Sequence, residues 1–148
     1  MKTGIELIAD ERQRQIEVEG WTPEHDDEHN DQSLQRAANC YADASSNILS
    51  ALEWATTKGV EFARRHEKTK EILADLEEIK ADPLKYHYGR DDNGQLKPPR
   101  FDWPSSWNTS WWKPSADPIR NLVKAGALIA AEIDRLQRQS QQTEPGGC

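Results

Sequence analysis

The side chains best suited to binding chemistry gather in residues 82–116. Aromatic rings alternate there with basic side chains, namely Tyr86, Tyr88, Phe101, Trp103, Trp107, Trp111 and Trp112 with Lys85, His87, Arg90, Lys97, Arg100 and Lys113. An aromatic ring can stack on a nucleobase while a cation pairs with phosphate, so this mixture suits a nucleotide. The competing interpretation is a hydrophobic clasp, in which several of the tryptophans pack over the helices. Pro, Gly and Ser predict a long Trp/Pro-rich loop, with a short hairpin turn at Asp91–Gly94.

A second group of polar side chains occupies residues 22–31, T-P-E-H-D-D-E-H-N-D, which we expect to be a loop. It contains H-x-x-E-H, a pattern that on a helix can hold zinc with two imidazoles. We reject a zinc site because a proline and flanking acids do not make the apolar helix on which such sites lie. Asp26, Asp27 and Glu28 remain an alternative site for a divalent ion, although acids in an exposed loop are more often simply solvated.

The best-formed element that could position these groups is a helix over residues 117–138. Asp117 is a good N-cap and Pro118 suits the first helical position. Apolar residues recur at steps of three and four, which predicts a seam packed against another helix: Ile119, Leu122, Gly126, Ile129, Ile133 and Leu136. Since Gly126 weakens a helix, it predicts the close approach of a neighbouring helix or a ligand.

Three further helices are expected, over residues 3–19, from Asp31 or Ser33 to about Asp43, and from Ile48 to about Lys80 with a bend or interruption at Gly59. In the second helix the residues expected to face inward are Leu34, Ala37, Ala38 and Tyr41. The first helix is apolar mainly in its first half, at Ile5, Leu7 and Ile8, with Ile16 further on. Arg12 and Gln15 extend the face of Ile5 and Ile8, so a site could lie there, although ordinary ion pairs explain that polar half equally well.

The length and composition of the chain limit which classes of protein it can belong to. A chain of 148 residues predicts one helical domain over 1–140 and a flexible tail over 141–148. The net charge of -7 argues against DNA or an anionic membrane as partner, and no apolar run approaches membrane-spanning length. No signal peptide is recognised at the N-terminus, and a disulfide between Cys40 and Cys148 is not expected, so we expect a cytoplasmic protein.

Three blocks of sequence resemble a family of small phage and prophage helical proteins with MazG-like, all-α nucleotide pyrophosphohydrolase relatives. The blocks are E-R-Q-R-Q-I-E-V-E-G-W, L-Q-R-A-A-N-C-Y-A and R-N-L-V-K-A-G-A-L-I-A-A-E-I-D-R-L. The resemblance implies an all-α, MazG-like helical bundle in which residues 45–100 form a long helical insertion. It also implies a homodimer or higher homo-oligomer in the cytoplasm of a bacterial host cell.

The chain departs from that family where its enzymes bind magnesium through E-E-x-x-E and E-x-x-D blocks. Near those positions it has Ala37, Ala38 and Tyr41, and then Asn121 and Lys124, which cannot hold a hard dication. The resemblance therefore implies a nucleotide binder without a metal cofactor or turnover, for example a sponge that sequesters a linear or cyclic immune nucleotide of the host. The residues expected to bind the ligand are Arg12, Gln15, Trp21, Arg36, Asn39, Trp111, Trp112, Arg120, Asn121 and Lys124.

Two other functions compete with this one. The first is a Mg²⁺-dependent nucleotide pyrophosphohydrolase whose acids have moved to other positions, using Glu11, Asp26, Asp27, Glu28 and Glu132. The second is a protein-interaction module that uses the Trp-rich loop, because Trp and Arg concentrate binding energy at interfaces.

Overall fold

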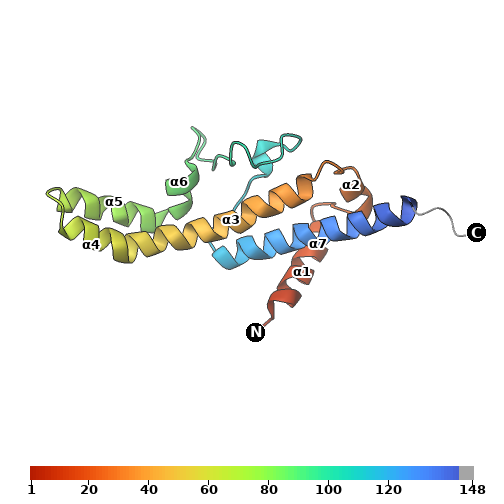
Figure 1. Ribbon diagram of the computed structural model, residues 1–148, viewed down its shortest axis with the longest axis horizontal. Helices are drawn as coiled ribbons and strands as arrows, with labels where there is room; N and C mark the ends of the chain where they lie inside the picture. The colour runs from red at the N-terminus through yellow and green to blue at the C-terminus, as the bar shows by residue number, and fades with distance from the viewer. Residues whose placement is uncertain (144–148) are drawn as a thin grey trace, which may run out of the picture.

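The computed structural model describes residues 1–143, and helices make up most of it (Figure 1). Within that range the only β pairing is a bridge between Arg90 and Leu96. The predicted all-α class is thus confirmed. The predicted tail over 141–148 falls partly outside the described residues, and its first three residues continue the last helix. Of the described helices, none combines the length and the apolar character needed to cross a membrane.

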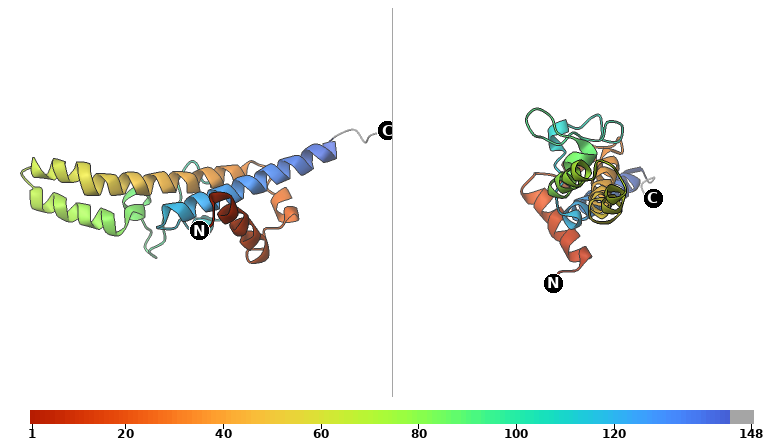
Figure 2. Two further views of the ribbon diagram at one scale, coloured as in Figure 1. Left: turned by 90° about the horizontal axis from the view of Figure 1, so that it is seen from below. Right: turned by 90° about the vertical axis from the view of Figure 1, so that its left-hand side faces the viewer.

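Two long helices, α3 (Ser33–Glu53) and α7 (Pro118–Thr143), lie side by side along the molecule (Figures 1 and 2). Their contact is lined by small or medium side chains, which lets two helix axes approach closely. The buried residues there include Ala37, Ala38, Ala44, Ala125, Leu128 and Ala131. The four residues predicted to face inward from α3 are all buried, so that prediction is confirmed.

The first helix, α1 (Gly4–Glu17), crosses α7 (Figure 1). Thr3 and Glu6 form a capping box that fixes its start. A Cβ atom added to Gly126 would lie 2.6 Å from Cδ1 of Ile8, so the two helices approach closely at this position. The close approach that the glycine predicts is therefore confirmed, and the neighbour is α1.

The seam predicted on α7 is buried only in part, where Gly126 meets Ile8 of α1, and the prediction is wrong for its large side chains. Its large aliphatic side chains are between 44% and 61% exposed, namely Ile119, Leu122, Ile129, Ile133 and Leu136. The helix instead buries a face of small residues together with Asn121, Glu132 and Arg135, whose polar groups are hydrogen-bonded. A buried polar group costs little when it is paired, so this face can pack against the alanines of α3.

The predicted end of the second helix near Asp43 is also wrong. Residues 44–47 contain neither Gly nor Pro, and Ala44 and Ile48 are buried four residues apart, so α3 continues to Glu53. A π-helical turn η1 (Trp54–Lys58) and α4 (Gly59–Arg64) follow, and the chain then reverses into α5 (Thr69–Ala81).

The single helix predicted from Ile48 to about Lys80 is wrong, because Ile48 belongs to α3 and the chain reverses after Arg64. At Gly59, where a bend or interruption is predicted, the π-helical turn passes directly into α4. A Cβ atom on this glycine would meet the carbonyl oxygen of Trp54 at 2.6 Å and Cδ2 of Leu76 at 2.7 Å, so a larger residue would not fit without movement. Ala51, Ala55, Leu76 and Ile79 form a second small core under this helical hairpin.

Residues 82–116 are less irregular than predicted. Asp82 caps a short helix, α6 (Pro83–Tyr88), whose proline lies at the first position. The predicted hairpin turn is confirmed, because the backbone N–H of Asp91 donates to the carbonyl of Gln95 at 2.8 Å. A short 3₁₀ turn, η2 (Thr109–Trp111), follows. Trp103, Trp107 and Trp112 are buried in the main core, so the clasp interpretation is confirmed for these three.

The segment over residues 22–31 is not entirely a loop, because Pro23–Asp27 form a short helix, α2. Thr22 caps it by accepting a hydrogen bond from the backbone N–H of His25. The helix packs against the C-terminal half of α7, where Arg138 pairs with Asp27 at 2.8 Å. The polar composition of this segment predicted a loop. The short helix forms because Thr22 caps it and α7 supplies a contact from another part of the chain.

Candidate functional site

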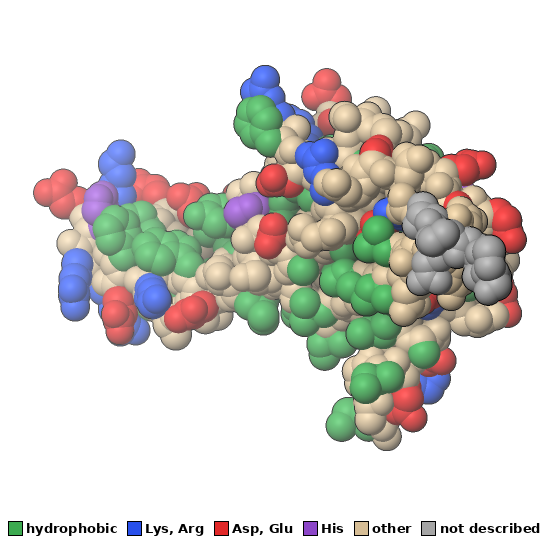
Figure 3. All heavy atoms as spheres, turned by 45° about the vertical axis from the view of Figure 1, so that its right-hand side comes forward, with side chains coloured by type: hydrophobic (Ala, Val, Ile, Leu, Met, Phe, Trp, Pro, Cys, Tyr) green, Lys and Arg blue, Asp and Glu red, His purple; other side chains and the backbone are tan. Residues whose placement is uncertain are grey.

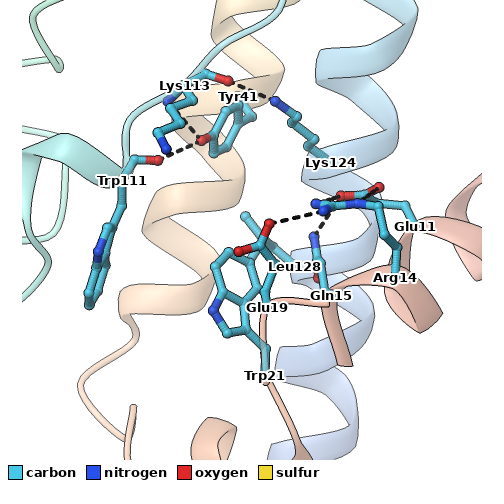
Figure 4. Close-up of a pocket in the computed structure, with 10 residues that line it drawn as sticks. All are labelled: Glu11, Arg14, Gln15, Glu19, Trp21, Tyr41, Trp111, Lys113, Lys124 and Leu128. Atoms are coloured by element: carbon cyan, nitrogen blue, oxygen red, sulfur yellow. Dashed lines mark hydrogen bonds and ion pairs between the residues drawn. The ribbon is translucent and has the colours of Figure 1, made fainter. Parts of the chain in front are cut away.

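A pocket of about 130 Å³ lies where α1, α3, α7 and the end of the Trp-rich loop meet. Figure 4 shows the lining side chains, with Trp111 on one side and Glu11, Arg14 and Gln15 on the other. The lining is completed by Glu19, Trp21, Tyr41, Lys113, Lys124 and Leu128. Segments distant in sequence therefore contribute aromatic, basic and acidic groups to one small space.

Glu11 is the most strongly bound carboxylate of the pocket. Both of its oxygens accept hydrogen bonds from Arg14 at 2.9 Å, and Arg120 of α7 pairs with Oε2 at 2.6 Å. Burial alone would raise the pKa of Glu11, but the hydrogen bonds from Arg14 and Arg120 outweigh burial and hold the pKa below its usual value. The carboxylate is thus ionised and already neutralised, which leaves it little capacity to bind a metal ion.

Lys124 presents its ammonium group between α7 and the loop. Its Nζ donates to the carbonyl oxygen of Lys113 at 2.7 Å and lies 5.4 Å from the ring centroid of Tyr41. Burial lowers the pKa of Lys124, and the nearby Arg120 adds to the effect. An anion placed beside this ammonium would relieve the unfavourable burial of its charge.

Tyr41 anchors the loop at the pocket. Its hydroxyl donates to the carbonyl oxygen of Trp111 at 3.1 Å and accepts from the backbone N–H of Lys113 at 3.2 Å. Burial raises the pKa of this hydroxyl to about 12, so it remains protonated near neutral pH. The two hydrogen bonds hold residues 111–113 in place beside α3.

Gln15 leaves one polar atom of the pocket unpaired. Its side chain is only 2% exposed and its Nε2 donates to Glu11 at 3.3 Å, but its Oε1 has no hydrogen-bond partner among the described residues. A buried acceptor without a partner costs on the order of 1–3 kcal/mol. An N–H or O–H group of a bound molecule would satisfy it.

The mouth of the pocket has an aromatic edge. Trp111 is 46% exposed and packs against Trp107 with ring centroids 5.6 Å apart, and Trp107 packs against Trp21 at 6.3 Å. Trp21 and Trp111 both line the pocket. Indole faces in such a position can stack on a planar ring.

Four of the ten residues predicted to bind a ligand line this pocket, namely Gln15, Trp21, Trp111 and Lys124. The other six have different positions. Arg36 is exposed and donates to the carbonyl oxygen of Phe101, and Asn39 is exposed on α3 without lining the pocket. Trp112 belongs to the core instead of the pocket lining.

The remaining three predicted residues are held by other parts of the chain. Arg12 pairs with Asp26 and donates to the carbonyl oxygen of Trp21. Arg120 lies behind Glu11, and Asn121 is fully buried, where it hydrogen-bonds the backbone of Ser115. These three side chains shape the surroundings of the pocket but do not line it.

Six lining residues are outside the ten expected to bind the ligand, namely Glu11, Arg14, Glu19, Tyr41, Lys113 and Leu128. Lys113 was nevertheless among the loop cations considered suited to phosphate, and Glu11 among the acids of the alternative hydrolase. One signal was available in the sequence, because Glu11 lies four residues before Gln15 and therefore on the same helix face. Tyr41 looked like a core residue, and it does pack into the core while its hydroxyl reaches the loop.

The alternative metal residues are not gathered into one site. Asp26 is 1% exposed and paired with Arg12, Asp27 pairs with Arg138, and Glu28 is exposed. Across residues 1–143 no group of three or more His, Cys, Asp and Glu side chains is arranged to hold a metal ion. The two histidines of H-x-x-E-H lie close together, with their Nε2 atoms 3.4 Å apart.

The carboxylates proposed for a hydrolase are likewise dispersed. Glu132 accepts hydrogen bonds from Nε and Nη2 of Arg135, at 2.9 and 2.7 Å. Glu11 is bound by Arg14 and Arg120. Hydrolysis of a nucleotide through metal ions needs carboxylates that are free to coordinate them.

The fold and the pocket define an all-α protein with a small site lined by basic, acidic and aromatic side chains. No family model, curated protein or solved structure matches the chain. The resemblance to MazG-like phage proteins therefore stays a prediction from the sequence.

Proposed function

We propose that the pocket binds a nucleotide-type anion and leaves it chemically unchanged. The observation that carries this proposal is the local charge. Three basic and two acidic side chains line the pocket, and Arg120 adds a fourth cation behind Glu11, whereas the whole chain has a net charge of -7. A locally basic, partly buried site on an acidic protein favours an anionic ligand.

The size of the pocket limits how much of a nucleotide it can hold. Its volume of about 130 Å³ is below the roughly 300–1,000 Å³ usual for a site that encloses a drug-sized ligand. We therefore place one group of the ligand, a phosphate or the edge of a base, beside Lys124 and Gln15. The rest of the ligand would lie at the mouth, where Trp111 and Lys113 offer stacking and charge.

The state of the carboxylates supports binding without turnover. Glu11 and Glu19 are the acids that line the pocket, and both accept hydrogen bonds from Arg14. Both oxygens of Glu11 and one oxygen of Glu19 are thereby occupied, so the lining offers no group of free carboxylates to coordinate a metal ion. From the resemblance to phage proteins, we further propose that the purpose of binding is to sequester a nucleotide signal of the host.

Thermal unfolding tests the proposal directly. The purified protein is heated with a panel of linear, cyclic and ADP-ribose-derived nucleotides, with and without Mg²⁺, and each ligand is then recovered and analysed by chromatography. At a concentration a hundredfold above its dissociation constant, a ligand should raise the free energy of unfolding by about 2.7 kcal/mol. This corresponds to a rise in Tm on the order of 8 °C. Ligand converted to product would show an enzyme, and a panel without any shift would rule out nucleotide binding.

Binding should also weaken at alkaline pH. The pKa of Lys124 lies below its ordinary 10.5, so its ammonium loses its proton earlier than an exposed lysine does. Below that pKa the charged form attracts the anion, and above it the attraction is lost, so affinity should fall as the pH rises. Calorimetric titrations between pH 7 and 10 measure the effect, and Lys124→Met should flatten the profile. A wild-type profile as flat as that of the variant would exclude Lys124 as the contact.

A further inference from the structure

Two imidazole rings meet at the C-terminal end of α2, and neither of them lines the pocket described above. Nε2 of His25 and Nε2 of His29 are 3.4 Å apart, and the ring centroids are 4.7 Å apart. This separation exceeds the roughly 2.7–3.2 Å of ordinary hydrogen bonds from N–H groups. Two nitrogens bound at about 2.0–2.1 Å to one tetrahedral zinc ion lie roughly 3.3–3.4 Å apart. The two atoms are therefore spaced as ligands of one metal ion.

Aromatic neighbours hold both rings in this arrangement. His25 stacks on Trp21, with the ring planes 6° apart and the centroids 6.2 Å apart. His29 meets the edge of Trp107, with the centroids 5.5 Å apart. Trp107 is buried in the main core and also packs against Trp21, so the four rings form one cluster. Ligands that are fixed before the ion arrives lose little conformational freedom when they bind it.

The carboxylate of Asp26 lies behind the first imidazole. Its Oδ1 is 3.4 Å from Nδ1 of His25, and its Oδ2 is paired with Arg12. A carboxylate in this position favours the tautomer that carries its proton on Nδ1, which leaves the lone pair of Nε2 for a metal ion. Carboxylates commonly occupy this position behind metal-binding histidines.

The surroundings of the pair are open to solvent and acidic. Both histidine side chains are partly exposed, so an ion can reach them from outside. The two aspartates of α2 are paired with arginines, whereas Glu24 and Glu28, on either side of them, are exposed. The helix lies beside the C-terminal end of α7 (Figure 1), and Figure 3 shows acidic side chains (red) at this end of the molecule. Such negative charge raises the local concentration of cations.

We propose that His25 and His29 bind one Zn²⁺ ion through their Nε2 atoms, with water completing its coordination. Imidazole nitrogen is a good ligand for zinc, whereas Mg²⁺ prefers oxygen. A catalytic zinc site has three protein ligands. Among residues 1–143 no three His, Cys, Asp or Glu side chains are arranged to hold a metal ion, so the pair binds the ion without forming a hydrolytic centre. The proposal does not depend on the proposed function of the pocket.

Calorimetric titration of the untagged chain with Zn²⁺ measures the site, at about pH 7.5, where an imidazole with the ordinary pKa of about 6.5 is mostly neutral. We expect one ion per chain. The variant His29→Gln should bind Zn²⁺ about 100-fold more weakly or worse, because it loses one of two linked ligands. Excess Mg²⁺ should leave the titration unchanged, since it prefers oxygen ligands.

The other two histidines of the chain supply a matched control. His66 and His87 are both exposed. The double variant His66→Gln/His87→Gln should bind Zn²⁺ as the wild type does, whereas His25→Gln/His29→Gln should not bind it. Cys148→Ser, which removes a thiol outside the described residues, should also bind as the wild type does. Nitrogen NMR of the wild-type rings needs no substitution, and Zn²⁺ should shift Nε2 of His25 and His29 alone.

Three results would overturn the proposal. The first is a wild-type chain without saturable Zn²⁺ binding. The second is binding that the two double variants retain or lose equally, because the ion would then not be held by the α2 pair. The third is displacement of Zn²⁺ by Mg²⁺, which would assign the binding to carboxylates instead of imidazoles.

Discussion

Replacing Asp26 by Ala should lower the free energy of unfolding by about 3–5 kcal/mol, the usual loss when one partner of a buried ion pair is removed. The Asp26 side chain is 1% exposed, and its partner Arg12 is 12% exposed. Without the carboxylate, the guanidinium of Arg12 would stay largely buried with its charge uncompensated. Such a loss is a large fraction of the stability of an ordinary domain.

Urea unfolding followed by circular dichroism measures this effect, and the neighbouring residue supplies a matched control. Asp27 pairs with Arg138, but the two side chains are 42% and 29% exposed. Solvent screens such a pair, so Asp27→Ala should cost less than about 1 kcal/mol. Equal losses in the two variants would show that the Arg12–Asp26 pair does not support the fold more than a surface pair does.

Replacing Lys124 by Glu should weaken nucleotide binding by about 100-fold or more, equivalent to about 2.7 kcal/mol. The substitution puts a carboxylate where an anion is expected, and it removes the hydrogen bond from Nζ to the carbonyl oxygen of Lys113. The repulsion between the new carboxylate and the anion weakens binding, and so does the loss of the hydrogen bond that positions this part of the pocket.

Calorimetry with the nucleotide that gives the largest thermal shift measures this loss. Lys70→Glu is the control, because it makes the same change of net charge on the exposed face of α5, away from the pocket. Affinity should be retained in that control. If Lys124→Glu binds as tightly as the wild type, the ligand does not occupy this pocket.

The sequence predicted the all-α class, the first helix and the last helix, but it missed α2, the length of α3 and the reversal between α4 and α5. It also did not predict which face of α7 is buried. The regular steps of Ile and Leu mark a strong apolar seam, whereas the buried face consists of small residues and of paired polar groups such as Asn121 and Glu132. The hydrophobic periodicity of a sequence depends only on its apolar side chains. It therefore cannot predict the burial of a polar residue that is stabilised by a hydrogen-bond partner elsewhere in the chain.

The candidate site was predictable only in part, for a related reason. Gln15, Trp21, Trp111 and Lys124 were predicted from residue type and position, and the structure brings these four into one pocket. Arg120 has the same character as Lys124, but it is held by Glu11 from another helix. Such pairs depend on how α1 crosses α7, and local spacing does not contain that information.

The most direct measurement of the central claim is equilibrium dialysis of the wild-type protein against the nucleotide panel, with the bound and free ligand identified afterwards by mass spectrometry. The account predicts one nucleotide per chain, recovered unchanged, with retention reduced in Trp111→Ala because Trp111 lines the mouth of the pocket. Retention of no nucleotide, or recovery of a hydrolysed product, would contradict it.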